Sequence, residues 1–279
     1  MSTTSIPSIR LRDDRTIPQI GLGVWQVPDD VATDACLAAF EAGYRHIDTA
    51  ALYGNEEGVG RAIKASGIPR EELFITTKVW NTDQGHDKTV AAMQASLERL
   101  DLDYVDLYLI HWPTPGRDLY VETWNTVLEL QERGMTTSAG VSNFHEEHLR
   151  RIIDESGQTP VINQIELHPW LPQRAVRAVD DELGIVTEAW SPLASGGLLD
   201  EAVLSAIGAK YGKSNAQVMI RWHLQLGNVV LPKSVTPERI RSNIDVFDFE
   251  LDADDLIAIE GLEDESKRTG PNPDLFNEA

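Results

Sequence analysis

Cysteine is almost absent from this chain of 279 residues, in which Cys36 is the only one. A single cysteine excludes an internal disulfide and a cysteine-rich zinc site. Cys36 lies within a predicted amphipathic helix, which favours a packing role over a nucleophilic one. The cysteine content points to a reducing compartment, and we expect the protein in the cytoplasm.

Long apolar segments are also missing. No uninterrupted apolar run reaches the roughly 20 residues that a bilayer-spanning helix needs. The first residues, MSTTSIPSIRLRDD, lack the apolar core of a secretory signal. With 42% hydrophobic and 25% charged residues, the composition is typical of a soluble globular protein. We expect no membrane association.

Basic residues are scarce. The chain has 24 Lys and Arg against 45 Asp and Glu, which gives a net charge of -21. Such a surface repels the phosphates of nucleic acids and anionic membranes, so we expect neither partner. A phosphorylated ligand would need basic residues that are concentrated locally against this background.

Short apolar strands alternate with helical segments. After a predicted hairpin at residues 8–11 and 16–20, eight strands follow, each with helical sequence behind it. Apolar runs such as LYLI and FITT suit a parallel sheet that is covered on its outer face. This number of βα units favours a closed (β/α)8 TIM barrel, an α/β fold, over an open doubly wound sheet. No linker is visible, so we predict a single domain over residues 1–279, with a C-terminal extra helix and tail.

Polar side chains fall at the ends of the predicted strands. In a (β/α)8 barrel the active site lies at the C-terminal ends of the strands. Those ends are predicted to carry Asp48, Lys78, His111, Ser142, Asn143, Gln164, Trp190 and Lys233. Chance placement is the competing interpretation, but its repetition at one strand end after another favours a functional site.

The stretch GYRHIDTAALYGNEEGVG, residues 43–60, brings a carboxylate and a phenol together. Asp48 ends a strand and Tyr53 lies in the loop that follows. Taken alone, they could be a turn tyrosine and a helix-proximal aspartate. With Lys78 and His111 they suggest acid-base chemistry, because an ammonium lowers the pKa of a phenol from about 10, and a buried ammonium needs a carboxylate partner.

Such a group suits proton donation to an oxygen that becomes negative, as a carbonyl oxygen does when hydride adds to its carbon. His111 could supply a second hydrogen bond or relay a proton. No side chain is a hydride source, so a nicotinamide cofactor is implied.

The segment LPKSVTPERIRSNIDVFDFEL, residues 231–251, is the candidate phosphate site. It places hydroxyl and basic residues at a strand end and the start of a helix, a combination that binds phosphate. An ordinary capped helix with solvated basic residues is the alternative. Gly21 and Gly23 do not form a Rossmann fingerprint, because no third glycine opens a helix there.

On these residues the chain resembles the aldo-keto reductase family from end to end, and it is similar to the bacterial 2,5-diketo-gluconate reductase-like branch. The segments GYRHIDTAALYGNEEGVG, LYLIHWP, AGVSNF, NQIELHP and LPKSVTPERI occur in the family's order. The resemblance implies a (β/α)8 barrel that binds NADPH without a Rossmann domain. It implies a monomeric oxidoreductase that reduces aldehydes or ketones, such as small dicarbonyls, keto-sugar acids or aromatic aldehydes.

The resemblance also implies roles for individual residues. Tyr53 would be the general acid of a tetrad with Asp48, Lys78 and His111. The residues expected to bind the cofactor are Gly23, Val24, Trp25, Ser142, Asn143, Gln164, Trp190, Ser191, Pro192, Leu193, Lys233, Ser234, Val235, Thr236, Arg239 and Asn243. Of these, Ser142, Asn143 and Gln164 would hold the carboxamide, and Trp190 would stack on the nicotinamide. No metal is expected.

The chain departs from the family pattern in places. Ser242 replaces a glutamate that many members have near the adenine, so that clamp, and the preference for NADPH over NADH, could be looser. Thr137 and Ala139 replace the residues usual before GVSN, and Trp190 replaces a tyrosine. We expect the aromatic plate to keep its role.

Three tryptophans at strand ends, Trp25, Trp80 and Trp112, are predicted to wall the substrate pocket, although each could be a packing residue. We expect the loops after His111 and Trp190, with the tail from residue 263 to 279, to shape that pocket. The sequence does not name the substrate or the direction of the reaction.

Two other functions stay open. A barrel hydrolase would use paired carboxylates such as Asp48 and Glu166, but it leaves Lys78 and the basic cluster without a purpose. A cofactor-sensing regulatory subunit would bind the nucleotide tightly with negligible turnover.

Overall fold

Eight parallel strands form the centre of the molecule in the computed structural model, which describes residues 6–278. Neighbours in the chain are neighbours in the sheet, from β3 to β10. The strands are β3 (Leu22–Gly23), β4 (His46–Asp48), β5 (Phe74–Val79), β6 (Val105–Ile110), β7 (Thr136–Ser142), β8 (Ile162–Glu166), β9 (Val186–Trp190) and β10 (Val229–Val230).

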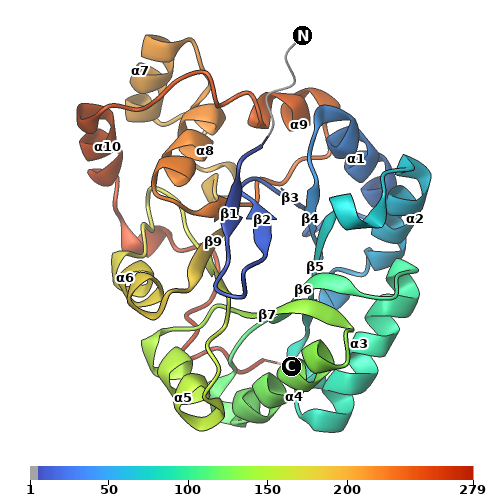
Figure 1. The fold of residues 1–279 in the computed structure, drawn as a ribbon. Helices are drawn as coiled ribbons and strands as arrows, with labels where there is room; N and C mark the ends of the chain where they lie inside the picture. The colour runs from blue at the N-terminus through green and yellow to red at the C-terminus, as the bar shows by residue number, and fades with distance from the viewer. Residues whose placement is uncertain (1–5, 279) are drawn as a thin grey trace.

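The sheet closes on itself beside β3. Ile20 bridges Val230 in parallel. The Gly21 N–H donates to the Val230 carbonyl at 3.0 Å, and the Val230 N–H donates to the Gln19 carbonyl at 2.9 Å. The predicted (β/α)8 barrel is therefore confirmed, and Figure 1 shows its helices arranged around the strands.

Ten α-helices belong to the part of the chain that the structure describes. They are α1 (Asp29–Ala42), α2 (Glu56–Ser66), α3 (His86–Leu100), α4 (Tyr120–Glu132), α5 (Glu146–Ser156), α6 (Arg174–Leu183), α7 (Ala202–Tyr211), α8 (Asn215–Gln225), α9 (Pro237–Asn243) and α10 (Ala253–Glu260). Within residues 6–278, no helix has both the length and the apolarity needed to cross a bilayer. The assignment of the chain to one domain stays a prediction.

The helices bury apolar faces against the barrel or against one another, as α7 does against α8 and α10. On α1 the buried face includes Cys36, whose complete burial raises the pKa of its thiol to about 12. The thiol is therefore protonated at neutral pH, as expected of a packing residue. Glycines let α2 approach its neighbours closely, because a Cβ on Gly58 would lie 2.3 Å from the Asp29 carbonyl, and one on Gly60 would lie 2.4 Å from the Leu100 carbonyl.

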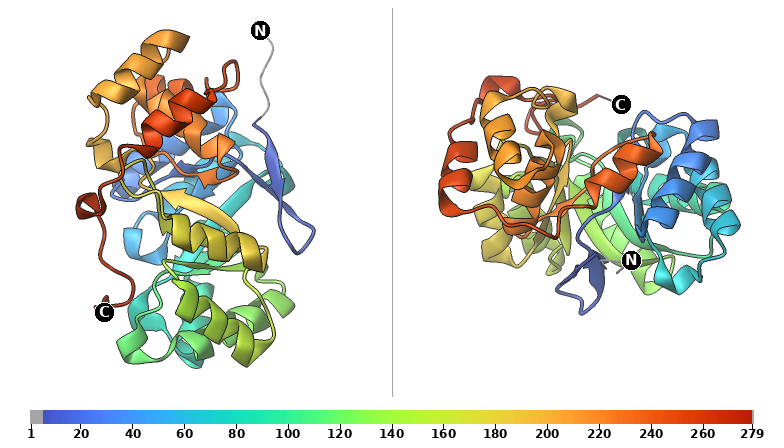
Figure 2. Two further views of the ribbon diagram at one scale, coloured as in Figure 1. Left: turned by 90° about the vertical axis from the view of Figure 1, so that its left-hand side faces the viewer. Right: turned by 90° about the horizontal axis from the view of Figure 1, so that it is seen from above.

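The predicted hairpin closes the N-terminal end of the barrel. It consists of β1 (Ser8–Arg10) and β2 (Thr16–Pro18), which pair antiparallel. Leu11 and Ile17 pack with apolar side chains at the barrel's base, including Phe74 and Leu107. Figure 2 shows the hairpin and the C-terminal tail on opposite faces of the molecule, so the far end of the barrel is left for the tail and the predicted site.

Candidate active site

Lys78 is the centre of the predicted tetrad. It lies on β5 with its side chain fully buried, and its ammonium donates to both carboxylate oxygens of Asp48 at 2.8 and 2.7 Å. It also donates to the Thr49 carbonyl at 2.9 Å and reaches the Tyr53 hydroxyl at 3.4 Å. The structure therefore brings the carboxylate, the ammonium and the phenol together as the sequence predicts.

The charges in this cluster follow from burial and partners together. Burial alone would lower the pKa of Lys78, but the Asp48 carboxylate and Tyr53 outweigh it and leave that pKa raised. Burial raises the pKa of Tyr53, and the opposing effect of Lys78 is smaller. The expected lowering of the Tyr53 pKa is thus wrong for this structure. A phenolate at this position would be stripped of its hydration and repelled by the Asp48 carboxylate, and both effects raise the pKa. Tyr53 is a protonated donor.

His111 completes the group. Its ring packs edge-to-face against Tyr53, with 5.6 Å between ring centroids, and against Trp80 at 5.0 Å. Burial, followed by the nearby Lys78 charge, holds the pKa of His111 well below its usual value. The imidazole is therefore neutral at physiological pH and offers one N–H donor.

The residues predicted to hold a carboxamide lie beside the tetrad. Asn143 adopts a left-handed conformation, with φ of 63°, directly after β7. Its side-chain NH2 donates to the His111 carbonyl at 2.9 Å and to Ser142 Oγ at 3.0 Å, and its Oδ1 accepts from Trp190 Nε1 at 2.9 Å. The Gln164 side chain donates to Asp48 Oδ1 at 2.8 Å. This network fixes the edge of the Trp190 ring.

The loop after β3 is tied to the tetrad by a residue that the sequence analysis missed. The buried Asn55 side chain donates to the carbonyls of Val24 and Val27 at 2.8 and 2.9 Å. Its Oδ1 accepts from the hydroxyl of Thr49, the residue after Asp48, at 2.7 Å. Gly23 and Val24 are buried, whereas Trp25 is 50% exposed. Asn55 could not be identified from its position at a helix start.

The predicted phosphate residues lie after β10, around the start of α9. Lys233, Val235 and Arg239 are exposed, and Ser234 and Asn243 are buried. The Ser234 hydroxyl accepts a bond of 3.1 Å from the Thr236 N–H. Lys233 and Arg239 form no ion pair with any residue between 6 and 278, although many cations of this acidic protein are paired.

The remaining residues predicted to bind the cofactor follow β9. Ser191 has a left-handed backbone and is half-buried, Pro192 is buried and Leu193 is half-buried.

Several exposed apolar side chains lie in segments that follow the C-terminal ends of strands. Trp25, Leu52, Leu199 and Val235 are 42–50% exposed, and each belongs to a segment that follows a strand. Trp80 is half-buried at the end of β5. Trp112 is instead 7% exposed, beneath the tail residue Phe276, with 4.7 Å between their ring centroids. The tail therefore covers Trp112, one of the three tryptophans predicted to wall the substrate pocket.

The tail crosses the ends of several strands. Its Glu278 carbonyl accepts from Asn81 at 2.8 Å, its Asn277 Oδ1 accepts from the Gly116 N–H at 2.6 Å, and Asp274 contacts His145 at 2.8 Å. Near its start it is held by Glu166, which accepts bonds from Thr269 and Gly270. Glu166 thus anchors the tail, and this contact gives no support to a paired-carboxylate hydrolase.

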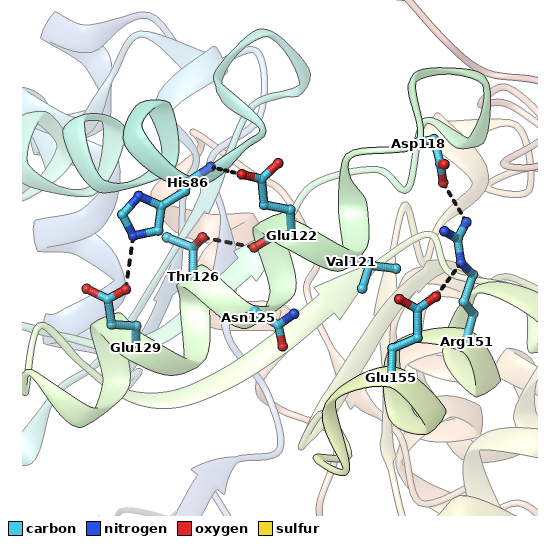
Figure 3. A pocket seen from close by; sticks show the side chains of 9 residues that line it. All are labelled: His86, Asp118, Val121, Glu122, Asn125, Thr126, Glu129, Arg151 and Glu155. Atoms are coloured by element: carbon cyan, nitrogen blue, oxygen red, sulfur yellow. Dashed lines mark hydrogen bonds and ion pairs between the residues drawn. The ribbon is translucent and has the colours of Figure 1, made fainter.

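Two surface cavities lie away from these residues. One has a volume of about 570 Å³ and lies among α3, α4 and α5. Figure 3 shows its lining residues, among which His86 contacts Glu129, and Arg151 contacts Asp118 and Glu155. The other, of about 1170 Å³, lies beside the hairpin and α1. Neither is lined by a predicted catalytic or cofactor residue, so the strand-end cluster remains the candidate site.

Relatives that cover nearly the whole chain occur among curated proteins and solved structures. The chain is 56% identical to an aldo-keto reductase of Mycolicibacterium smegmatis, over 97% of this chain and 98% of the relative. It is 54% identical to methylglyoxal reductase DkgA of Escherichia coli K12, over 96% of this chain and 97% of the relative. Among solved structures, a Gox0644 variant in complex with NADPH superposes with a TM-score of 0.94 at 47% identity, covering 98% of this chain and 99% of that chain.

A Bombyx mori aldo-keto reductase in complex with NADP gives a TM-score of 0.87 at 40% identity, covering 93% of this chain and 94% of that chain. Residues 19–264 match the family described as the Aldo/keto reductase family. On its sequence, its barrel and these relatives, the chain belongs to the aldo-keto reductase family.

Proposed function

We propose that this protein is an NADPH-dependent reductase of small aldehydes and ketones, with Tyr53 as the proton donor. One observation carries the proposal. The Tyr53 hydroxyl lies 3.4 Å from the ammonium of Lys78, which is buried and bonded to the Asp48 carboxylate at the C-terminal ends of the strands. Family membership supports carbonyl reduction. The NADPH-bound and NADP-bound relatives support the cofactor.

The strand-end residues fit a nicotinamide. Both donors of the Gln164 amide are used within the barrel, but no residue between 6 and 278 donates to its Oε1. That oxygen is available to accept from a carboxamide NH2. The half-buried Trp190 ring, held at its edge by Asn143, offers a flat surface for stacking. Lys233 and Arg239 would contact the phosphate of the adenosine end.

When bound, NADPH supplies the hydride that adds to the carbonyl carbon. The chain's own residues supply the proton and the orientation. Tyr53 donates its hydroxyl proton to the carbonyl oxygen as negative charge develops there. Lys78 stabilises the resulting phenolate, and Asp48 keeps Lys78 charged. The neutral His111 donates a hydrogen bond that orients the carbonyl oxygen.

The substrate class follows from the rim of the site. The exposed Trp25, Leu52 and Leu199 make an apolar mouth, and the tail narrows it over Trp112. This rim suits small dicarbonyls and aromatic aldehydes, and keto-sugar acids would need their hydroxyls to face water. The relative named methylglyoxal reductase supports the dicarbonyl class.

The test is NADPH consumption by the wild type with methylglyoxal, phenylglyoxal and diketo-gluconate, compared with Tyr53→Phe. Loss of the proton donor should lower kcat by roughly 10²–10⁴-fold while NADPH still binds, as measured by fluorescence titration. Tyr104→Phe, at a half-buried tyrosine near the opposite end of the barrel, is the control. Undiminished turnover by Tyr53→Phe would refute the mechanism. Tight NADPH binding by a wild type without turnover would instead favour the regulatory alternative.

A further inference from the structure

A carboxylic acid lies inside the barrel below the tetrad. Glu188 belongs to β9 and is fully buried. Side chains alternate along a strand, so Glu188 shares the inward face of β9 with Trp190, whereas Thr187 points outward and donates to Asp180 of α6 at 2.8 Å. The mechanism above gives Glu188 no role.

Gln164 joins Glu188 to Asp48. Gln164 and Glu188 are register partners on the neighbouring strands β8 and β9. The Gln164 amide nitrogen donates to Asp48 Oδ1 and to Glu188 Oε2, each at 2.8 Å. A side-chain amide has only two N–H donors, so both are used by the two carboxyl groups. Glu188 therefore sets the rotation of the amide that contacts Asp48.

The other oxygen of Glu188 forms no ion pair with a lysine or arginine among the described residues. Its Oε1 has no hydrogen-bond partner within residues 6–278, and it lies 3.8 Å from His46 Nε2. Burial lowers the pKa of His46 to about 3, so that ring is neutral. Lys78, on β5, directs its donors to Asp48 and the Thr49 carbonyl.

The charge of Glu188 follows from these surroundings. Burial, followed by repulsion from Asp48, raises the pKa of Glu188 to about 8. The groups that face it are His46 and Asp48 of β4, Lys78 of β5 and Tyr53; the other neighbouring strand, β10, contains only valines. At neutral pH the acid is protonated, and the buried Asp48–Lys78 pair is the only charged part of this group.

We propose that Glu188 is a positioning residue for the carbonyl reduction, because it holds the Gln164 amide against Asp48 and so fixes the carboxylate that anchors Lys78. The inference rests on the proposed function. Ionisation of Glu188 would add a second anion below the tetrad, and that charge raises the pKa of both Tyr53 and Lys78. A less acidic Tyr53 is a poorer proton donor, so activity should fall as pH rises through the Glu188 transition.

The experiment compares Glu188→Leu, which removes the acceptor, with Glu188→Gln, which keeps an acceptor oxygen but cannot ionise. Glu98→Gln, at an exposed position on α3, is the control. Glu188→Leu should lower kcat by about tenfold or more through the displaced Gln164 and Asp48. NADPH affinity should fall by a smaller factor, because Gln164 is only one of the residues proposed to hold the cofactor and the adenosine end would keep Lys233 and Arg239. Glu188→Gln should restore most of that kcat and should lack the alkaline decrease that the wild type and Glu98→Gln show above about pH 8.

A second measurement detects the protonation state of Glu188 directly and does not depend on turnover. In an Asp180→Asn background, which removes the other buried carboxyl group with a raised pKa, difference infrared spectra should show the carbonyl band of a protonated carboxylic acid that disappears as pH is raised. The band should be missing when Glu188→Gln is added. This comparison tests whether Glu188 is protonated in the folded protein even if Glu188→Leu does not fold. A band that persists when Glu188→Gln is added, or an alkaline decrease that Glu188→Gln shares with the wild type, would overturn the inference. Absence of turnover by the wild type would overturn the proposed function itself.

Discussion

The carboxylate of Glu166 accepts a hydrogen bond of 2.9 Å from the backbone N–H of Gly270, so the end of β8 holds the C-terminal tail. The same carboxylate accepts from the N–H and hydroxyl of Thr269 at 2.6 and 2.8 Å and contacts His168 at 2.9 Å. A Cβ on residue 270 would lie 2.6 Å from the Trp190 ring. The tail therefore passes directly against the indole that we propose to stack on the nicotinamide.

Glu166→Gln should loosen the tail. The new NH2 group would face donors, so at least one part-buried N–H would lose its acceptor, at a cost of about 1 kcal/mol. We expect faster amide hydrogen exchange in residues 268–278, and a KM for carbonyl substrates that rises severalfold, more than kcat falls. The control is Glu265→Gln, at an exposed tail residue. Tail protection equal to that of the wild type would show that Glu166 does not anchor it.

Lys78→Met tests the buried ion pair. The substitution leaves Asp48 buried without its cation, which should reduce the free energy of unfolding by roughly 3–5 kcal/mol. Turnover should fall by roughly 10²-fold or more, because the phenolate of Tyr53 loses its stabilising charge. Urea denaturation and NADPH consumption measure the two effects.

A second substitution separates the effect of the ion pair on stability from its effect on catalysis. Asp48→Asn combined with Lys78→Met should recover part of the stability and none of the activity. Lys64→Met, which breaks an exposed pair with Asp101, should change the free energy of unfolding little. Equal losses of stability in Lys64→Met and Lys78→Met would contradict the buried-pair interpretation.

The phosphate site is tested by Lys233→Glu combined with Arg239→Glu. If these exposed cations contact the phosphate that distinguishes NADPH from NADH, the KM for NADPH should rise at least tenfold and that for NADH much less. Arg241→Glu is the control, because Arg241 already pairs with Glu238 and lines the cavity beside the hairpin. A similar rise for both cofactors would place the phosphate elsewhere.

The sequence predicted most of the framework because its signals are local. The predicted alternation of strands and helical segments is found, for example where helix α3 (His86–Leu100) follows β5. The apolar strands end at polar residues, and in a parallel barrel those ends meet on one face. This rule was sufficient to bring Asp48, Lys78 and Tyr53 together. The second hairpin strand is shorter than predicted, because it ends at Pro18 and not at residue 20.

The remaining features depend on contacts between distant residues. Gln164 and Asp48 are 116 positions apart, and nothing in the sequence around either indicates their bond. Glu188 was not identified from the sequence, because only the structure shows which groups face it inside the barrel. The tail has no hydrophobic periodicity from which its path over the barrel could be predicted. The direction of the Tyr53 pKa shift depends on burial, which a motif does not report. The roles of the site residues stay predictions.

Asp180 provides a pH test of stability outside the site. It is buried on α6, where it accepts from Asn163 at 3.1 Å and from Thr187 at 2.8 Å. Burial raises its pKa from 3.8 to about 7. Between these values the folded protein binds a proton that the unfolded chain releases. This group therefore stabilises the fold fully below about pH 4, and its contribution is lost as pH rises through 7.

Asp180→Asn removes this titration and keeps one acceptor oxygen, and the Thr187 hydroxyl can turn to accept. The free energy of unfolding of the wild type should fall relative to the variant by on the order of 4 kcal/mol between pH 4 and pH 8. Urea denaturation across this range measures the difference, with the exposed neighbour Asp181→Asn as the control. Parallel curves for wild type and Asp180→Asn would mean that Asp180 is ionised throughout. The Asn163 amide, which also bonds the Phe144 backbone at 3.0 Å beside Asn143, would then be held by a buried charge.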